Sequence, residues 1–375
     1  MPKIINAPKP KHKGAGHRKR LRERLKKNIG TVAVIGPNSD QSFVLLGNYN
    51  GTPSDPITPL RGIKEKLAGV SEVLYAQGCT WAAGMPGNQQ DPAQLKAEAL
   101  EIAKRANVII MCMGITPRLE GEEMRVSIEG FRGGDRTRLD LPDVQQELIK
   151  EIHALGKPVI LVLLNGSALA INWEKDNIPA IIETWYGGQA AGQALADVIF
   201  GDYNPGGRLP VTFYKSAEDL PAFTEYKMDN RTYRYFKGEP LFPFGYGLSY
   251  TTFKYSKLKV VKSCNVGDTL KIAVKVQNTG KLAGDEVVQL YLSDLTADVP
   301  VPIHALKGFT RIHLNPGETK SVILTLNPDA FSIIDNDNQR RVKPGKFEIF
   351  IGGHQPNQKA TKGEPDILKK VITLM

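Results

Sequence analysis

Apolar runs and amphipathic stretches alternate along the first half of the chain. A continuous apolar run is typical of a strand buried on both faces, and apolar residues spaced by about 3.6 positions predict a helix packed on such a sheet. Strands are predicted at residues 31–36, 73–76, 108–113, 158–164 and 180–185, with an edge strand at 208–213. Helices are predicted at residues 58–67, 91–106, 143–155 and 187–200. The alternation predicts that residues 30–213 form an α/β three-layer sandwich with a mainly parallel sheet.

The pattern changes after residue 213. Residues 214–256 are rich in Tyr, Phe, Pro and Gly and have no clear period, so we interpret them as a connector. Farther along, apolar and polar residues alternate with a period of two, which indicates half-buried strands. These strands are predicted at residues 270–277, 286–292, 319–326 and 346–351, with turn sequences between them. Residues 257–375 are therefore predicted to form an all-β sandwich.

The net charge of +10 belongs to the first residues of the chain. Residues 1–28 contain eleven lysines or arginines and one acid, Glu23, whereas the remaining residues carry 38 basic and 38 acidic side chains. We predict that residues 1–29 form a disordered basic tail, with nucleic-acid binding through this tail as the alternative. The tail lacks the apolar segment of a secretory signal peptide, which favours a cytoplasmic location by default. No apolar run reaches the length of about 18 residues that spans a membrane.

The sequence contains no pattern that is typical of a cofactor or metal site. The three cysteines, Cys79, Cys112 and Cys264, are too widely spaced for a zinc site and form no disulfide framework. Gly36 follows a predicted strand but lacks the further glycines of a nucleotide-binding loop. We therefore expect no cofactor and no bound metal.

One long loop separates the strand at 108–113 from the helix at 143–155. Loops between a strand and a helix usually contain about 2–6 residues, and much longer ones are usually functional. This loop would leave the carboxyl end of a parallel strand, the edge at which open α/β sheets bind ligands. Its charged residues include Glu120, Glu122, Glu123, Glu129, Asp135, Arg118, Arg125, Arg132, Arg136 and Arg138. The alternative is a solvated surface loop whose acids pair with the nearby arginines.

Short segments rich in glycine, proline and aromatic residues recur through the folded part of the chain. They are AVIGPN (33–38), GDR (134–136) followed by Leu141-Pro142, WYGGQ (185–189), GDYNPGGRLP (201–210), FPFGYGLSY (242–250) and GDEVVQLY (284–291). Their sequences and order resemble glycoside hydrolase family 3, which contains β-glucosidases and β-xylosidases. The resemblance covers residues 31 to about 355 and implies an α/β sandwich followed by a fibronectin-III-like sandwich. The barrel of similar proteins, which carries the aspartate nucleophile, has no counterpart in this sequence.

The resemblance also implies where a catalytic acid/base lies. Retaining glycosidases use one carboxylate as nucleophile and a second carboxyl group as acid and base. The family places this acid/base glutamate ahead of a Gly-x-Asp-Arg-like element, which corresponds to residues 119–124 here. Glu122 is the first candidate, Glu120 the second and Glu123 the third.

Two further hypotheses concern residues beside these acids. Trp185 is a candidate for substrate binding, because an aromatic face can stack on the C–H surface of a sugar, although most such aromatics pack in the core. Asp135 and Arg136 could form an ion pair that holds the exit of the loop.

The resulting hypothesis is the carboxyl-terminal part of a retaining, exo-acting β-glycosidase that hydrolyses terminal β-xylosides or β-glucosides. Its expected partners are an oligosaccharide or glycoside and a separate barrel domain, without which we expect the chain to be inactive. The segment LGNYNG (46–51) and the long loop resemble the xylosidase branch more than the glucosidase branch. A non-catalytic carbohydrate-binding or scaffold fragment is the alternative. Similar proteins are often secreted or periplasmic, which leaves the location open.

Overall fold

The chain forms two compact units. A computed structural model describes residues 3–5, 24–85, 90–121, 123–356 and 367–375. The first unit comprises residues 1–205 and 213–219, and the second comprises residues 206–212 and 220–375. The chain therefore crosses between the units three times within a short stretch near residues 205–220.

The first unit is built on a six-stranded sheet with the strand order β1-β9-β8-β4-β2-β3. Its strands are β1 (Lys3–Ile5), β2 (Thr31–Ile35), β3 (Glu72–Ala76), β4 (Val108–Gly114), β8 (Val159–Leu164) and β9 (Ala180–Glu183). Neighbouring strands run parallel except β1, which pairs antiparallel with β9. The central strands β4 and β8 are buried along their whole length, as expected for continuous apolar runs. The predicted mainly parallel sheet is confirmed.

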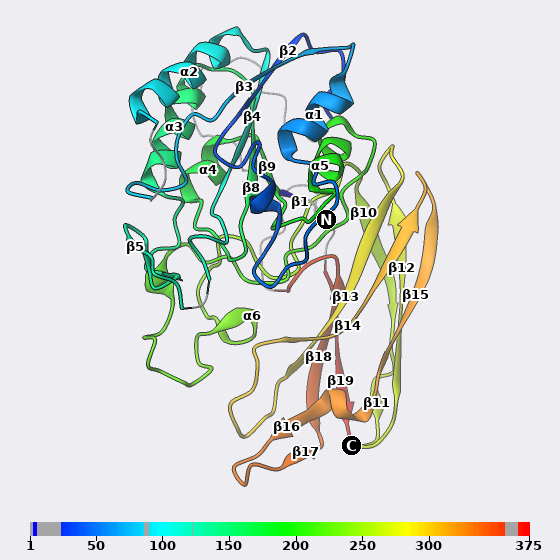
Figure 1. Ribbon diagram of the computed structural model, residues 1–375. Coiled ribbons are helices and arrows are strands. Elements are labelled where there is room, and N and C mark those ends of the chain that lie inside the picture. The colour runs from blue at the N-terminus through cyan, green and yellow to red at the C-terminus, as the bar shows by residue number, and fades with distance from the viewer. Residues whose placement is uncertain (1–2, 6–23, 86–89, 122, 357–366) are drawn as a thin grey trace. The chain divides into compact units, whose positions relative to one another are not determined.

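Helices lie on both faces of this sheet (Figure 1). They are α1 (Pro59–Leu67), α2 (Pro92–Arg105), α3 (Asp143–Ala154), α4 (Asn172–Asn177) and α5 (Ala191–Phe200), with 3-10 turns η1 (Ser42–Leu45) and η2 (Ala217–Asp219). Two helices begin at capping residues, because the side chains of Thr58 and Asp91 accept backbone N–H groups of the first turn. Gly201 ends α5 in a left-handed conformation, with φ +76°. The three-layer α/β sandwich that we predicted is therefore confirmed.

The expected edge strand at residues 208–213 is not formed. The Leu209 N–H instead donates to the Tyr246 carbonyl at 2.7 Å, and the Gly245 N–H donates to the Leu209 carbonyl at 2.8 Å. This segment therefore pairs with the FPFGYGLSY segment of the second unit. Pro210 removes a backbone donor, which disfavours a regular sheet ladder at this position.

Part of the expected basic tail takes part in the structure of the first unit. Residues 3–5 form β1, which differs from the predicted disorder. The Leu25 N–H donates to the Ile199 carbonyl at 3.0 Å, and the Lys27 ammonium lies 2.9 Å from the Asp202 carboxylate. Residues 6–23 of the expected tail lie outside the described residues.

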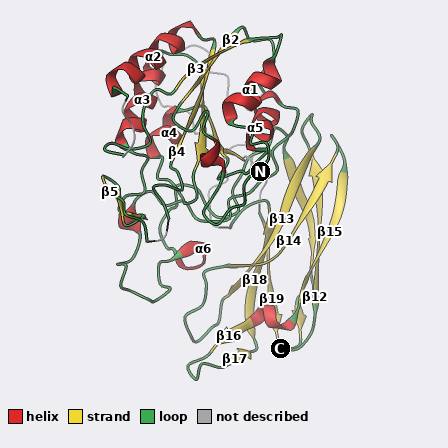
Figure 2. Cartoon of the chain, viewed as in Figure 1, coloured by secondary structure: helices red, strands yellow, loops and turns green. Residues whose placement is uncertain are grey.

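The second unit is a β-sandwich (Figure 2). One sheet has the order β10-β12-β15 and the other the order β11-β19-β18-β13-β14. The strands are β10 (Phe253–Lys259), β11 (Ser263–Cys264), β12 (Leu270–Asn278), β13 (Gly284–Asp294), β14 (Ala305–Leu314), β15 (Thr319–Leu326), β18 (Gly345–Gly352) and β19 (Leu368–Leu374). Helix α6 (Thr232–Tyr235), the 3-10 turn η3 (Pro328–Phe331) and the strand pair β16 (Ser332–Ile334) and β17 (Arg340–Val342) complete the unit. Inward-facing residues such as Ile272, Leu290 and Ile349 form its core, which confirms the predicted all-β sandwich.

An ion pair is buried within the second unit. Arg208 Nη2 donates to Glu286 Oε2 at 2.8 Å, and the Tyr255 hydroxyl donates to Glu286 Oε1 at 2.8 Å. Burial raises the pKa of Glu286, and the charge of Arg208 opposes that rise. Removal of one partner would leave an uncompensated buried charge, which is strongly destabilising. Arg208, in the segment GDYNPGGRLP, therefore has a structural role.

All three cysteines are buried thiols. Cys79 and Cys112 belong to the first unit and Cys264 to the second. Burial raises the pKa of Cys79 and of Cys112 to about 12, and it also raises the pKa of Cys264. The reactive thiolate form is therefore scarce at neutral pH.

His304 is buried in an aromatic cluster of the second unit. Its ring lies 6.1 Å from the ring of Tyr233 and 5.9 Å from that of Tyr291, and Tyr233 stacks on Phe244 at 4.1 Å. The residue is 2% exposed, and among the described residues neither ring nitrogen has a hydrogen-bond partner. Burial lowers the pKa of His304 to about 4.

This histidine should make the second unit less stable in acid. A histidine whose pKa is lowered on folding contributes stability above its unfolded pKa of about 6.5, and this contribution is lost as the pH falls through 6.5 toward 4. A shift of this size corresponds to about 3 kcal/mol of unfolding free energy between pH 7 and pH 4. Urea unfolding at several pH values should show that the unfolding free energy of the protein falls by about 3 kcal/mol relative to that of His304→Leu as the pH drops from 7 to 4. An unchanged difference would show that the histidine is solvated.

Candidate active site

The long loop between β4 and α3 has short strands and a small apolar core. Strands β5 (Ser127–Ile128), β6 (Phe131–Arg132) and β7 (Asp135–Arg136) form an antiparallel sheet. Leu119 and Phe131 are at most 4% exposed and belong to one buried cluster with Ile115 and Ala82. A fully solvated loop would bury no such cluster, so the loop is an integral part of the first unit.

Two buried amide side chains fix the beginning of the loop. Gln145 of α3 accepts the Gly114 N–H at 2.9 Å and donates to the Gly114 carbonyl at 2.6 Å. Asn38, which follows β2, donates to the carbonyls of Met113, Ile115 and Leu164 at 3.2–3.3 Å. Both amides satisfy backbone groups that the ends of the strands leave unpaired. The loop therefore leaves the sheet in a defined direction.

Glu120 ties the loop to the ends of two neighbouring strands. Its Oε1 accepts the Gly166 N–H at 2.5 Å and also accepts from the Tyr186 hydroxyl, and its Oε2 accepts from the Ser167 hydroxyl at 2.6 Å. Gly166 and Ser167 follow β8, Tyr186 follows β9, and the loop itself follows β4. The glutamate therefore joins the carboxyl ends of three adjacent parallel strands, the edge at which open α/β sheets bind ligands.

Arg136 and Tyr186 complete the network around Glu120. Arg136 Nη1 donates to the Ser167 hydroxyl at 3.1 Å and to the Ala168 carbonyl at 2.6 Å. Burial lowers the pKa of Arg136, and the charge of Glu120 opposes this change. Burial, and then the negative charge of Glu120, raise the pKa of Tyr186, so the phenol stays a neutral donor. Both oxygens of Glu120 are thus occupied by donors of the protein itself.

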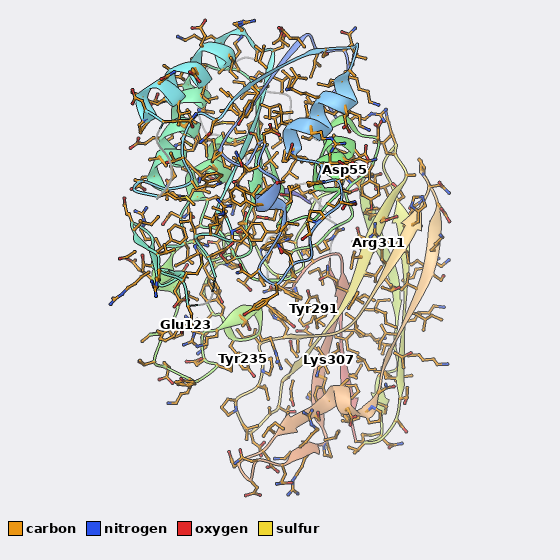
Figure 3. All side chains as sticks on the ribbon, viewed as in Figure 1. Asp55, Glu123, Tyr235, Tyr291, Lys307 and Arg311 are labelled. Carbon is orange, nitrogen blue, oxygen red and sulfur yellow. The ribbon has the colours of Figure 1, made fainter. Side chains whose placement is uncertain are left out.

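The two other candidate acids, Glu122 and Glu123, come shortly after Glu120 in the sequence. Glu122 lies outside the described residues. The preceding residue, Gly121, is held in place because its N–H donates to the Gly134 carbonyl at 3.3 Å. The two glycines approach closely, since a Cβ on Gly134 would lie 1.7 Å from the Gly121 carbonyl oxygen. Glu123 is exposed (Figure 3) and has φ +53°, a conformation that residues other than glycine rarely adopt. Backbone strain of this kind is concentrated at functional sites.

The expected ion pair between Asp135 and Arg136 is absent from the described part of the loop. Adjacent residues of a strand point to opposite faces, and both residues lie in β7. The guanidinium of Arg136 turns to Ser167 and Ala168 instead. The prediction of this ion pair was wrong.

Trp185 packs within the first unit. It is half-buried, with its ring 6.0 Å from the ring of Phe213 in an edge-on arrangement. Its backbone has φ +55°, and this unusual conformation lies next to Tyr186. Of these two adjacent aromatic residues, Tyr186 is the one whose side chain donates to Glu120 of the loop.

Gly166, Ser167 and Tyr186 are the site residues that sequence reasoning missed. Each follows a predicted strand, at 158–164 or 180–185, in the same way that the long loop follows the strand at 108–113. The carboxyl ends of parallel strands meet at one edge of a sheet. This shared position was the available signal.

Two family models match the chain. Residues 25–250 match the glycosyl hydrolase family 3 C-terminal domain, and residues 286–355 match a fibronectin type III-like domain. The chain belongs to glycoside hydrolase family 3. The resemblance carried by its short sequence segments is confirmed, and the matched fibronectin-like region lies in the β-sandwich of the second unit.

Similar family 3 proteins are glycosidases. A β-xylosidase of Formosa agariphila is 42% identical over 340 residues, which cover 86% of this chain and 44% of the relative. A xylan 1,4-β-xylosidase of Xylanibacter ruminicola is 42% identical over 339 residues, which cover 90% of this chain and 38% of the relative. The solved structure of a β-glucosidase from Erythrobacter marinus matches with a TM-score of 0.81 at 32% identity, over 100% of this chain and 49% of that one. The family 3 chain thus spans less than half the length of these proteins.

Among the described residues, no helix has the length and apolar character that crossing a membrane requires. In the same part of the chain, no cluster of three or more His, Cys, Asp or Glu side chains could hold a metal ion.

Proposed function

We propose that this family 3 chain supplies the acid/base of a retaining, exo-acting β-glycosidase that hydrolyses terminal β-xylosides or β-glucosides. Glu122 is the proposed acid/base, with Glu123 as second candidate. This residue would protonate the leaving-group oxygen as the glycosidic bond breaks. It would then take a proton from the water that hydrolyses the glycosyl-enzyme.

The network of Glu120 carries this proposal. A general acid must offer its proton to the substrate, whereas both oxygens of Glu120 already accept hydrogen bonds from Gly166, Ser167 and Tyr186. We therefore assign Glu120 to anchoring the loop. Glu122 and Glu123 follow the anchored Glu120 by two and three positions in the sequence.

The nucleophile is assigned to another part of the enzyme. The two matched xylosidases extend well beyond the portion that this chain matches, since 38–44% of their length is covered. Xylosides are the favoured substrates, because both of these relatives are 42% identical, whereas three matched β-glucosidases are 34%, 35% and 38% identical.

Complementation tests the proposed function. The chain alone should hydrolyse nitrophenyl β-xyloside very slowly or not at all, because it contributes no nucleophile. Co-expression with the amino-terminal portion of a matched xylosidase should restore turnover. Turnover by the isolated chain near a typical enzyme value of about 10 per second would show that it holds a nucleophile of its own.

A non-catalytic carbohydrate-binding or scaffold fragment is the second candidate function. It is favoured by the network of Glu120, in which both carboxylate oxygens already accept hydrogen bonds from the protein itself. This function predicts that the complemented pair stays inactive while the chain alone binds xylo-oligosaccharides. Calorimetric titration with xylotriose, beside the hydrolysis assay, separates the two functions.

A further inference from the structure

A small pocket lies in the second unit, away from the acidic loop in sequence. Arg234 of α6 and Lys307 of β14 contribute its basic residues, and Asp294 of β13 contributes a carboxylate. The rest of the lining is mainly apolar and includes Leu292, Val301, Phe331 and Phe347. The pocket thus combines an apolar lining with two cations and one carboxylate.

The two basic side chains have no acidic partner in the described part of the chain. Neither Lys307 nor Arg234 forms an ion pair there, and the carboxylate of Asp294 accepts the N–H of Thr296 at 2.9 Å. Lys307 is half-buried. Burial, and then the positive charges of Arg234 and Arg340, lower the pKa of Lys307. With the Asp294 carboxylate also in the lining, the two basic side chains leave the pocket with one net positive charge.

The backbone around these cations is fixed before any ligand arrives. The Ile303 N–H donates to the Arg234 carbonyl at 2.7 Å, and the Leu306 N–H donates to the Tyr233 hydroxyl at 3.0 Å. These bonds hold α6 against the beginning of β14, next to Lys307. Binding would therefore order few further groups, which favours affinity.

The size of the pocket limits the ligand. Its volume is about 60 Å³, whereas one ordered water needs roughly 10–15 Å³ on the same measure. A carboxylate or sulfate group fits this space, and a whole sugar ring does not. Charge-assisted hydrogen bonds from arginine and lysine are the strong contacts for such groups.

We propose that this pocket binds an oxyanion, the carboxylate or sulfate group of an acidic ligand, between Arg234 and Lys307. The rest of the ligand would lie outside the pocket. This site is independent of the proposed glycosidase chemistry, because none of its residues belongs to the acidic loop. Lys307 in particular carries a positive charge that is costly without an anion beside it.

Titration of the whole chain tests the proposal. Calorimetry with sodium glucuronate and with sodium sulfate, at ionic strength matched by sodium chloride, should show saturable binding with a Kd on the order of millimolar. Glucose, which has no charge, should not bind. Tighter binding of glucuronate would point to a uronic acid as the natural ligand, and tighter binding of sulfate would point to a sulfate ester.

Lys307→Met distinguishes a binding site from a surface charge. This variant should weaken binding of both anions at least tenfold, and without ligand it should unfold at a temperature equal to or above that of the unaltered chain, because it removes a half-buried cation. Lys271→Met, at an exposed position of β12, is the matched control and should change neither property. The proposal is overturned if neither anion binds saturably, or if both variants lose the same affinity, which would indicate a general charge effect.

Discussion

Replacing Glu122 by Ala should slow the hydrolysis of alkyl β-xylosides by about 10²–10⁴-fold in the complemented enzyme. Poor leaving groups need a proton as the glycosidic bond breaks, and Glu122 is the proposed donor. Dinitrophenyl xyloside should be affected much less, because its leaving group departs without protonation. Azide should rescue the variant by attacking the glycosyl-enzyme, for which no general base remains. Steady-state rates across a series of leaving groups measure these effects.

Glu123→Ala is the matched control for Glu122→Ala. The two acids are adjacent and carry the same charge, so a general effect of charge near the site should appear in both variants. If Glu123→Ala alone shows leaving-group dependence and azide rescue, the acid/base role belongs to Glu123. If neither variant shows them, Glu129 becomes the next residue to test, and the position carried over from the family is wrong.

Glu120→Ala should lower kcat by about 10²-fold for all leaving groups alike. The change removes the acceptor for Gly166, Ser167 and Tyr186 and leaves their donors unsatisfied. The loop would then lose its fixed position, and a misplacement of about 1 Å can cost this factor. Two measurements check this result. The slope of the rate against leaving-group pKa should equal that of the unaltered enzyme, and added azide should not restore the rate.

Glu120→Gln provides the conservative comparison. Its amide oxygen can still accept hydrogen bonds, whereas its NH₂ group would face one of the donors, so we expect a loss smaller than that of Glu120→Ala. Tyr186→Phe removes one of the three bonds and should have a smaller effect than Glu120→Ala. A steep leaving-group dependence in Glu120→Ala would contradict the anchoring role and make Glu120 the acid.

The sequence was sufficient for most regular elements of the first unit. Buried parallel strands are continuous apolar runs, and the helix starts at Thr58 and Asp91 are marked by residues whose side chains cap the first turn. The segment at 208–213 misled the prediction, because its apolar residues pair with a loop and not with the sheet. In the second unit we predicted β12, β13, β15 and β18 but missed the other strands, β10, β11, β14, β16, β17 and β19. One of them, β14, contains Gly308 and a register shift opposite Leu290 and Tyr291.

The long loop could be singled out from the sequence as a candidate site, but its internal contacts could not be predicted. A loop of unusual length at the end of a strand indicates a functional position whatever its contacts. The partners of Glu120 come from residues 46, 47 and 66 positions farther along the chain. Such pairings are created by the sheet order, in which β8 and β9 lie beside β4. No local pattern around Glu120 distinguishes an anchored glutamate from a catalytic one.

The buried cysteines can report local opening of the structure around them. A thiol reagent needs both access and a thiolate, and burial denies both to Cys112 and Cys264 in the closed structure. The labelling rate of each cysteine therefore measures how often the structure around it opens, as amide exchange does for backbone groups. Because Cys112 belongs to the first unit and Cys264 to the second, mass spectrometry of labelled peptides can follow the two units separately in a single sample.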